Sequence, residues 1–534
     1  MNSWDHKVLA GFLAIAATLA LSGTGEPAAA QTASLVPPPR TIADITAILD
    51  QEKPDVGKLA KLAAEADETL PKSTARAAEF LYSRAQARAA LGRTREATAD
   101  TEAAIKAAQG GDYVDELSRY ENYLIRLLRT TGEQRRAIEL LNGQIRNFES
   151  KNRGRLFNLN LMMTISHLNL GDVPRAESYV QRNRALLAES RKWQNFGLYG
   201  SNWTAQVEDG NGRIFEAHGR FADAEKAYHH SADQFRDALA RSPQYQTPPP
   251  RGAIENAIDW DTAFEGRVKA KQGRVAEGEV DVRRALLGRL SAVGKYHPDT
   301  AGILGIFAWV LGEQGRNAEA EQLVRTIIEI YKGMKFPDDS PPAVNARVQL
   351  ANVLNAQRRF EDAAKVYQEI DRLVTGWEPS RRETISSGLA RVSVMLVTGS
   401  ATEALEMARN TLERERARSG ENSFGTALAR GFVAMSLARA NRAGEAVAEF
   451  RAAIPTLLAG LTSKSRRGRR DGGRTREPGA NGRRILSRGF GAPAGTGGSR
   501  HWRGDVWPCR RRAWSRRRAG AGGVKPARGR KGSG

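Results

Sequence analysis

The sequence holds a single cysteine, Cys509, which lies close to its C-terminal end. One thiol cannot form an intramolecular disulfide, and it cannot build the paired-cysteine sites that hold structural zinc or exchange thiols. The rest of the chain therefore has no thiol nucleophile and depends on side-chain packing for its stability.

Long apolar runs and strand-like patterns are also scarce. The long apolar run VLAGFLAIAATLAL, from Val8 to Leu21, is shorter than the roughly 20 residues that a membrane-spanning helix needs. Sustained alternation of apolar and polar residues, which is typical of strands, is almost absent. We therefore predict an all-α chain with no transmembrane span once the N-terminal run has been removed.

Short catalytic signatures are missing as well. The sequence contains no GxxxxGK[ST], HExxH or GxSxG motif. His229 and His230 are adjacent, and neighbouring residues on a helix point about 100° apart, so the pair is a poor chelate. We predict that the chain is not an enzyme and that it needs no cofactor or metal.

The charge of the chain is concentrated at one end. The whole chain carries a formal charge of +22, of which the residues from Leu461 onward contribute +19 and the preceding body +3. The basic balance, which would otherwise suggest nucleic acid or an anionic surface as a partner, therefore describes the tail and not the body.

The N-terminus has the anatomy of a secretory signal peptide. Lys7 precedes the apolar run, and Ala28, Ala29 and Ala30 follow as a small-residue cleavage site. We predict that residues 1–30 are a signal peptide and that the mature protein is periplasmic or secreted. Residues 31–76 would then form a Pro-rich linker and an N-terminal helical cap.

A repeat runs along the body, where apolar residues recur at i, i+3, i+4 and i+7. The segments that show it best are LGRTREATADTEAAI, HGRFADAEKAYHHSA, QGRNAEAEQLVRTII and QRRFEDAAKVYQEI. A small residue recurs at Ala97, Ala137, Ala176, Ala224, Gly278, Ala320, Ala363, Ala404 and Ala446. Five residues earlier stands a glycine, at Gly92, Gly132, Gly171, Gly219, Gly273, Gly315 and Gly399, or else Arg358 or Asn441. A second small residue precedes that position by seven, at Ala85, Gly212, Gly266, Ala308, Ala351 and Ala434.

This spacing predicts antiparallel helix pairs. Two helices approach closely only where the facing side chains are small, and glycine supplies the left-handed conformation that ends the first helix. A single pair cannot bury its remaining apolar face, so neighbouring pairs must stack.

The repeat resembles the tetratricopeptide repeat family over residues 77–460, in about nine helix-turn-helix units. YHPDTAGILGIFAWVLGEQGRNAEAEQLV, which begins at Tyr296, is similar to the long repeats of kinesin light chains and of the N-terminal arrays of bacterial proteins that carry a caspase-like CHAT domain. The resemblance implies a right-handed α-solenoid that serves as a protein-interaction scaffold.

In this family the first helix of each pair lines the concave surface, which implies a set of binding residues here. The candidates are Asn122, Arg126, Arg129, Arg213, Arg267, Lys271, Trp309, Asn352 and Asn355. Arginines there would favour a protein or peptide partner with an acidic segment, because guanidinium groups bind carboxylates through two hydrogen bonds. The alternative is a solvated wall with scattered charges.

Residues 461–534 form a tail rich in Arg and Gly with few aliphatic residues. Such a composition cannot bury enough apolar surface to fold, so we expect disorder. Export makes nucleic acid a poor candidate partner, and anionic envelope polymers or lipid headgroups would fit the charge better. Translation of a GC-rich gene out of frame also produces this composition, and the nucleotide sequence decides that question.

Three functions remain open at this stage. The first is an exported, non-catalytic scaffold. The second is the regulatory part of a truncated CHAT peptidase, although His501 and Cys509 lie in a segment without apolar periodicity and make no plausible dyad. The third is an envelope-anion binder that acts through the tail.

Overall fold

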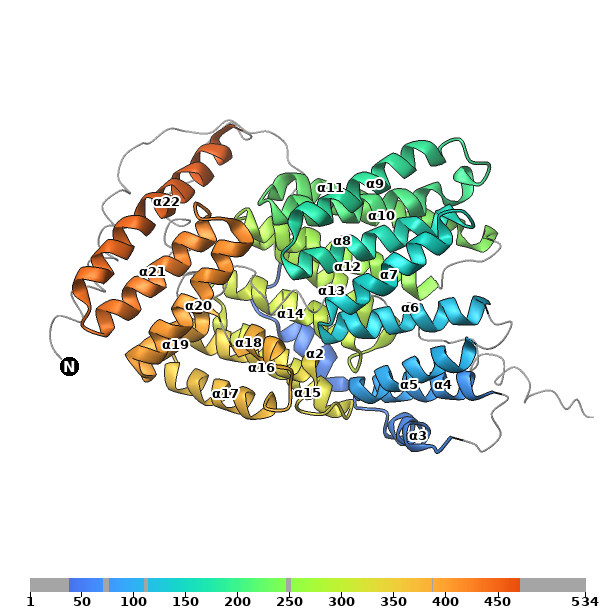
Figure 1. Cartoon of the computed structure of the whole chain (residues 1–534), viewed down its shortest axis with the longest axis horizontal. Coiled ribbons are helices and arrows are strands. Elements are labelled where there is room, and N and C mark those ends of the chain that lie inside the picture. Colours follow the sequence, from blue (N-terminus) through green and yellow to red (C-terminus); the bar gives the residue numbers. More distant parts are fainter. Residues whose placement is uncertain (1–37, 71–75, 110–113, 246–250, 387, 471–534) are drawn as a thin grey trace, which may run out of the picture.

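The computed structural model describes residues 38–470 apart from 71–75, 110–113, 246–250 and 387 (Figure 1). Throughout these described residues the secondary structure is helical, without a strand. The predicted signal peptide, residues 1–30, and the part of the tail from residue 471 lie outside them. The all-α prediction is confirmed for the rest.

Antiparallel helix pairs follow one another, and we number them units 1 to 9. The units are α4 (Ala77–Ala90) with α5 (Thr94–Ala108); α6 (Val114–Thr131) with α7 (Gln134–Phe148); α8 (Leu156–Leu170) with α9 (Val173–Ser190); α10 (Phe196–Ala217) with α11 (Phe221–Arg241); α12 (Arg251–Lys271) with α13 (Val275–Val293); α14 (Pro298–Glu313) with α15 (Asn317–Gly333); α16 (Pro341–Ala356) with α17 (Phe360–Leu373); α19 (Leu389–Thr398) with α20 (Ala401–Ser419); and α21 (Phe424–Arg439) with α22 (Ala443–Arg470). Short helices η1 (Arg153–Arg155), η2 (Ser242–Gln244) and α18 (Pro379–Ser386) lie between units.

The paired helices meet at the recurring small residues. Each alanine of the second-helix series is buried. In unit 5 both small residues are glycine, and a Cβ built on Gly266 would lie 2.6 Å from the carbonyl oxygen of Gly278. A Cβ on Gly278 would lie 2.3 Å from the carbonyl oxygen of Gly266. Neither position can take a larger residue without separating α12 from α13.

The turns inside the pairs have the expected left-handed backbone. Gly92, Gly132, Gly171, Gly219, Gly273 and Gly315 all have φ between 70° and 91°. Arg358 and Asn441, which replace glycine, adopt φ of 61° and 58°. Gly399 differs, because its φ of −115° is extended, and there the left-handed turn that the sequence predicts is wrong.

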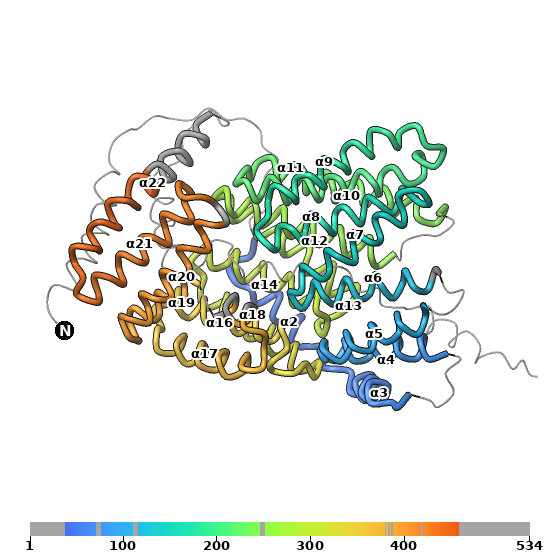
Figure 2. Tube along the Cα trace, in the orientation of Figure 1, coloured from blue at the N-terminus to red at the C-terminus, as the bar shows by residue number. Residues whose placement is uncertain are grey.

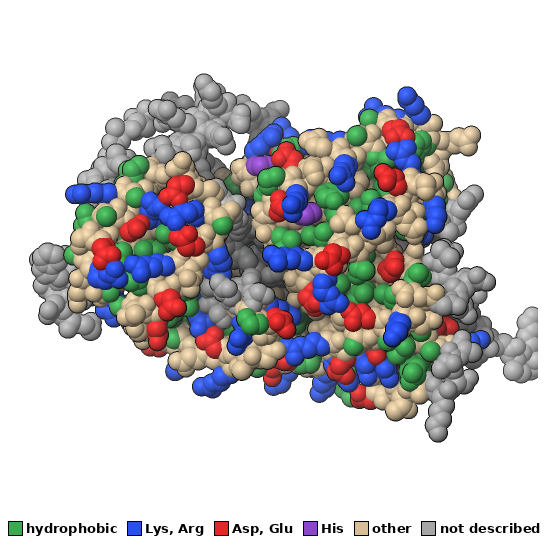
Figure 3. All heavy atoms as spheres, in the orientation of Figure 1, with side chains coloured by type: hydrophobic (Ala, Val, Ile, Leu, Met, Phe, Trp, Pro, Cys, Tyr) green, Lys and Arg blue, Asp and Glu red, His purple; other side chains and the backbone are tan. Residues whose placement is uncertain are grey.

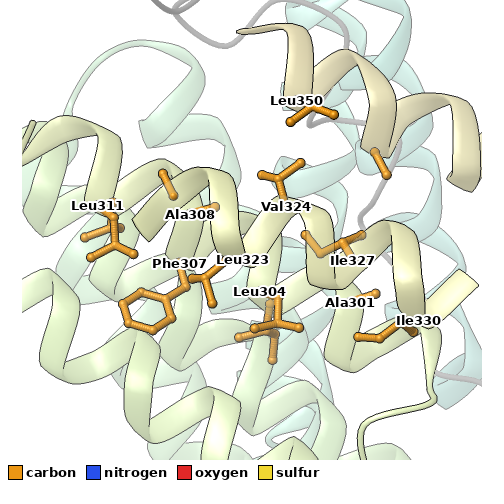
Figure 4. Close-up of a cluster of buried hydrophobic side chains, with 14 of the residues drawn as sticks. Ala301, Leu304, Phe307, Ala308, Leu311, Leu323, Val324, Ile327, Ile330 and Leu350 are labelled. Carbon is orange, nitrogen blue, oxygen red and sulfur yellow. The ribbon is translucent and has the colours of Figure 1, made fainter. Parts of the chain in front are cut away.

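First and second helices have different surroundings. Between Leu159 and Leu168 of α8 every residue except Met162 is buried, whereas α17 buries only Ala363, Tyr367 and Ile370. First helices therefore form the inside of the array. Figure 4 shows the core inside unit 6, where Leu304, Phe307 and Leu311 of α14 lie near Leu323 and Ile327 of α15.

A Gln-x-Arg segment at the turn ties each middle unit to the one before it. Gln314 Nε2 donates to Glu279 Oε2 at 2.7 Å, and Arg316 Nη1 donates to both oxygens of Glu279 at 3.1 and 2.9 Å. The same arrangement joins Gln272 and Arg274 to Glu225, and Gln357 and Arg359 to Glu321. Sequence analysis missed this pairing, although the repeated Gln-x-Arg is visible.

The N-terminal segment does more than cap unit 1. Helix α3 (Val56–Asp67) packs on α4 as expected, with Arg88 Nε donating to the carbonyl oxygen of Ala66 at 2.9 Å. Helix α2 (Ala43–Gln51), however, lies against α13 and α15. Unit 1 itself returns to unit 6, since a Cβ on Gly92 would lie 2.4 Å from Cγ of Phe336, just after α15. Figure 1 labels α5 and α15 near each other at this point, and Figure 2 traces the chain in the same orientation.

The array ends beyond the predicted boundary. Helix α22 continues to Arg470 rather than stopping at Gly460. The sequence placed residues 461–470 in the disordered tail, and in the structure they form the last turns of this helix.

We predict that Gly278→Ala destabilises the protein by about 1–3 kcal/mol, because the new methyl group overlaps the backbone of α12. Gly143→Ala in α7 is the matched control: its Cβ meets no atom within 4 Å, and it should gain about 0.5–1 kcal/mol of helix propensity. Thermal unfolding measures both variants. A Gly278→Ala protein as stable as the parent would contradict the close contact.

Candidate functional site

A stripe of polar and aromatic side chains follows the inner face of the middle first helices. On α10 it contains Gln206, Arg213 and Glu216; on α12 it contains Trp260, Phe264, Arg267 and Lys271; Trp309 of α14 and Asn352 of α16 continue it. The spacing within α10 and α12 is three, four or seven residues, which keeps the side chains on one helix face. We call these nine residues the inner wall.

Contacts between helices bring the stripe together. Lys271 Nζ lies 6.0 Å from the ring centroid of Trp309, which joins α12 to α14. A Cβ on Gly302 of α14 would lie 2.6 Å from Trp260, and one on Gly305 would lie 3.1 Å from Gln349 of α16. The sequence candidates Arg213, Arg267, Lys271, Trp309 and Asn352 therefore belong to one surface.

Glu216 is the centre of this surface. Its carboxylate accepts hydrogen bonds from Arg267 Nη2 at 2.6 Å, Lys271 Nζ at 2.8 Å and the Tyr228 hydroxyl at 2.9 Å. The guanidinium carbons of Arg213 and Arg267 lie 4.9 and 4.4 Å from the ring centroid of Phe264. Two of the predicted carboxylate-binding cations are thus already bound to a carboxylate of the chain itself.

Arg213 is buried beside two aspartates. Its Nε donates to Asp209 at 2.6 Å, while Ser231 Oγ lies 2.6 Å from Asp261 Oδ2 and 2.8 Å from the carbonyl oxygen of Ala205. Burial, with the charge of Asp209 adding to it, raises the pKa of Asp261 well above its usual range, whereas the hydrogen bond from the Ser231 hydroxyl lowers it.

Several buried polar atoms on the inside of the array have no hydrogen-bond partner among the described residues. On the inner wall they are Gln206 Oε1, Arg213 Nη1 and Arg267 Nε. On the same and neighbouring first helices they are Ser166 Oγ, Asn169 Oδ1, Asn256 Nδ2 and Asn345 Oδ1. Native proteins rarely leave such atoms unpaired, because each costs about 1–3 kcal/mol.

The remaining sequence candidates lie elsewhere. Asn122 and Arg126 of α6 are half-buried, and Arg129 is buried in the same helix of unit 2. Asn355 is buried between units, where it donates to the carbonyl oxygen of Ala390 at 3.3 Å and accepts from Ser393 at the same distance. Asn352 accepts from the Tyr367 hydroxyl at 3.1 Å, so the two asparagines do not share one role.

Asp299 and His297 lie at the start of α14, beside Trp260. Burial raises the pKa of Asp299 to about 7, against the lowering effect of Arg289 and of Arg126. Burial lowers the pKa of His297 to about 4, and its Nδ1 accepts from the backbone N–H of Asp299 at 3.2 Å.

Sequence reasoning missed Glu216 and Tyr228. Glu216 follows Arg213 by three residues on the same helix face, which was a usable signal, but its partners come from α11 and α12 and depend on how the units stack. Figure 3 shows cationic and anionic side chains interspersed over one face, in keeping with the small net charge of the body. Searches confined to the described residues find no acidic, His or Cys group suited to a metal ion, and no helix with the length and apolarity to cross a membrane.

No protein-family model and no curated protein matches the chain. One similar solved structure is a Rap protein complexed with Competence and Sporulation Factor: it is 13% identical, the alignment covers 74% of this chain and 100% of that one, and the TM-score is 0.43. Another is a signal transduction ATPase with a tetratricopeptide repeat sensor from Pyrococcus horikoshii, with 11% identity, 73% and 55% coverage and a TM-score of 0.42. A third is a putative kinesin light chain with TPR-like repeats from Podosopora anserina, with 13% identity, 38% and 96% coverage and a TM-score of 0.29. On the geometry of its own helix pairs, the chain is a tetratricopeptide-type α-solenoid.

We predict that Asp299→Asn gains stability relative to the parent as the pH rises from 4 to 7. The folded pKa of about 7 lies above the usual value, so over this range the unfolded chain releases a proton that the folded chain keeps. The free energy of unfolding of the parent then falls by up to about 1.4 kcal/mol per pH unit, whereas that of the variant does not. Over the whole range the two should diverge by roughly 2–4 kcal/mol.

His297→Gln is the matched comparison. Its free energy of unfolding relative to the parent should fall as the pH rises, which is the opposite of the change expected for Asp299→Asn. Because the folded pKa of His297 is about 4, the parent loses stability as the pH falls through about 6.5, where the unfolded histidine takes up a proton. Urea unfolding at several pH values measures both variants. A pH-independent difference for Asp299→Asn would contradict a protonated, buried Asp299.

Proposed function

We propose that this protein is an exported, non-catalytic scaffold that binds an extended peptide segment along its inner wall. One observation carries the proposal: buried polar atoms on the inner faces of first helices, such as Arg213 Nη1 and Arg267 Nε, have no partner among the described residues. A peptide backbone presents donors and acceptors at regular intervals, and it would supply the missing hydrogen bonds.

The ligand that fits best carries a carboxylate. Arg267, Lys271 and Tyr228 converge on Glu216, so the donors for an acidic group are already aimed at one point. A ligand carboxylate would exchange with that of Glu216, while the partly buried Trp309 ring beside Lys271 would cover its apolar part. Acidic protein segments are therefore the proposed partners, and the cations of the wall select them.

Two parts of the proposal, export and the absence of catalysis, are supported by the sequence alone. The N-terminal run followed by Ala28-Ala29-Ala30 supports secretion, and the missing catalytic motifs support a binding role. The two alternatives, a truncated CHAT peptidase and an envelope-anion binder, depend on residues after 470, outside the described part of the chain.

Glu216→Gln tests the ligand chemistry directly. The probe is a fluorescein-labelled decapeptide of alternating Glu and Ala with an amidated C-terminus, and the comparison peptide replaces Glu by Gln. The variant should bind the acidic probe about 10-fold or more tightly than the parent, because Arg267 and Lys271 lose their internal carboxylate. Arg267→Ala should weaken the same complex, and fluorescence anisotropy measures each.

Glu321→Gln is the matched control. It also removes a carboxylate that binds an arginine, Arg359, but at the junction of units 6 and 7 and away from the inner wall. All variants keep the same basic tail, so its contribution to the affinity for the probe is the same in each and cancels when the variants are compared. The proposal fails if Glu216→Gln shows no gain, or if Glu321→Gln or the Gln/Ala peptide shows an equal one.

A further inference from the structure

The N-terminal segment from Thr41 to Glu52 is bound to the array like a ligand. Ile42, Ile45 and Leu49 are buried in the main core cluster with side chains of α13 and α15. Ile48, on the flank of this buried stripe, is 41% exposed. The helix thus inserts one apolar edge between two outer helices and leaves the other edge in water.

Polar contacts at both ends hold this segment in register. Arg283 Nη1 of α13 donates to both carboxylate oxygens of Asp44 at 2.9 and 2.7 Å, and its Nη2 donates to the carbonyl oxygen of Thr41. The backbone N–H of Ile42 donates to Glu319 of α15 at 3.0 Å. At the other end Glu52 accepts from the backbone N–H of Lys295 at 2.6 Å.

The segment connects two distant parts of the array. Helix α2 is held by units 5 and 6, whereas α3 is held by unit 1 through Ala66 and Asp67, which accept from Arg88 and Arg93. Only residues 52–55 join the two helices, and Pro54 lies 3.2 Å from the Cβ position of Gly333. Figure 1 shows α2 near the middle of the molecule and α3 beside α4 and α5 at its edge.

We propose that α2 is a removable strap that keeps unit 1 closed against unit 6 and so controls access to the inner wall. A helix of nine residues is not stable alone in water, so release from the groove also unfolds it. The strap therefore has two states. When α2 is bound, units 1 and 6 are in contact; when α2 is released and unfolded, the two units separate. The part of this inference that concerns ligand access rests on the function proposed above; the closure itself does not.

The contacts of unit 1 explain why the strap governs closure. Apart from the strap, the contacts of unit 1 with units 6 and 7 among the described residues include the packing of Gly92 on Phe336 and a hydrogen bond from Arg95 to the carbonyl oxygen of Gly376. Both contacts come from one turn of the chain and the start of α5. The apolar edge of α2 and the Arg283–Asp44 pair form a separate attachment on α13 and α15. The Asp44 side chain is half exposed, which leaves it accessible to competitors.

The test measures the distance between units 1 and 6 in the full chain. Cys509→Ser removes the native thiol, and spin labels are placed at Lys106→Cys on α5 and Gln322→Cys on α15, both exposed. In the parent, pulsed electron paramagnetic resonance should give one narrow distance distribution. Ile45→Asp and, more mildly, Asp44→Asn should broaden it toward longer distances.

Two matched controls separate release from general damage. Ile48→Asp makes the same change on the exposed edge of α2, and Arg284→Ala removes an exposed neighbour of Arg283; both should leave the distribution narrow. Helical content by circular dichroism should fall only slightly in Ile45→Asp. An unchanged distance distribution in both Ile45→Asp and Asp44→Asn would overturn the strap.

Ligand access is measured separately with the Glu/Ala probe. Strap release should raise its association rate at least several-fold without changing the effect of Glu216→Gln. If the distance distribution broadens and the rate does not change, the strap closes the array but does not control entry. If Glu216→Gln shows no gain while the distances still respond, the proposed ligand is wrong and the closure stands.

Discussion

The structure depends on the close approach of paired helices at small residues. At Gly266 and Gly278 two backbones come within the distance that a single methyl group would occupy, and buried alanines repeat a looser form of this contact in the other units. Because every pair closes at a small residue in the same position of the repeat, the first helices lie on the inside of the array and the second helices lie on the outside. The inner wall exists because of that regular placement.

A second constraint joins the pairs to one another. Glu279 is 1% exposed and is bound by Gln314, Arg316 and Arg283. A buried carboxylate needs all these donors, since removal of one partner leaves a charge that water cannot reach. Arg283 also holds Asp44 of α2, so the contact that sets unit 6 on unit 5 also aligns the strap. The stacking of unit 6 on unit 5 and the docking of α2 are therefore physically coupled through Arg283.

The sequence predicts the structure within each helix pair, but it does not predict the contacts between units that are far apart in the array. Helix pairs, their turns and their buried small residues follow from spacing alone, and even the left-handed Arg358 and Asn441 occupy positions where a glycine was expected. The contact of Gly92 with Phe336 and the docking of α2 do not follow from spacing. They depend on the small rotation between each unit and the next, summed over five units. The site shows the same limit. Arg213, Arg267 and Lys271 were chosen by position. Asp209 neutralises Arg213 from one turn away on the same helix, but the pairing of Arg267 and Lys271 with Glu216 depends on the placement of α12 beside α10.

The most direct test of the account is to find which face of the array touches its partner. A photo-cross-linking amino acid can replace Trp309 on the inner wall, or Gln368 on the exposed side of α17, in cells that make the full chain. The account predicts a cross-linked protein adduct at position 309 and none at position 368. Adducts at position 368 without any at position 309 would contradict it.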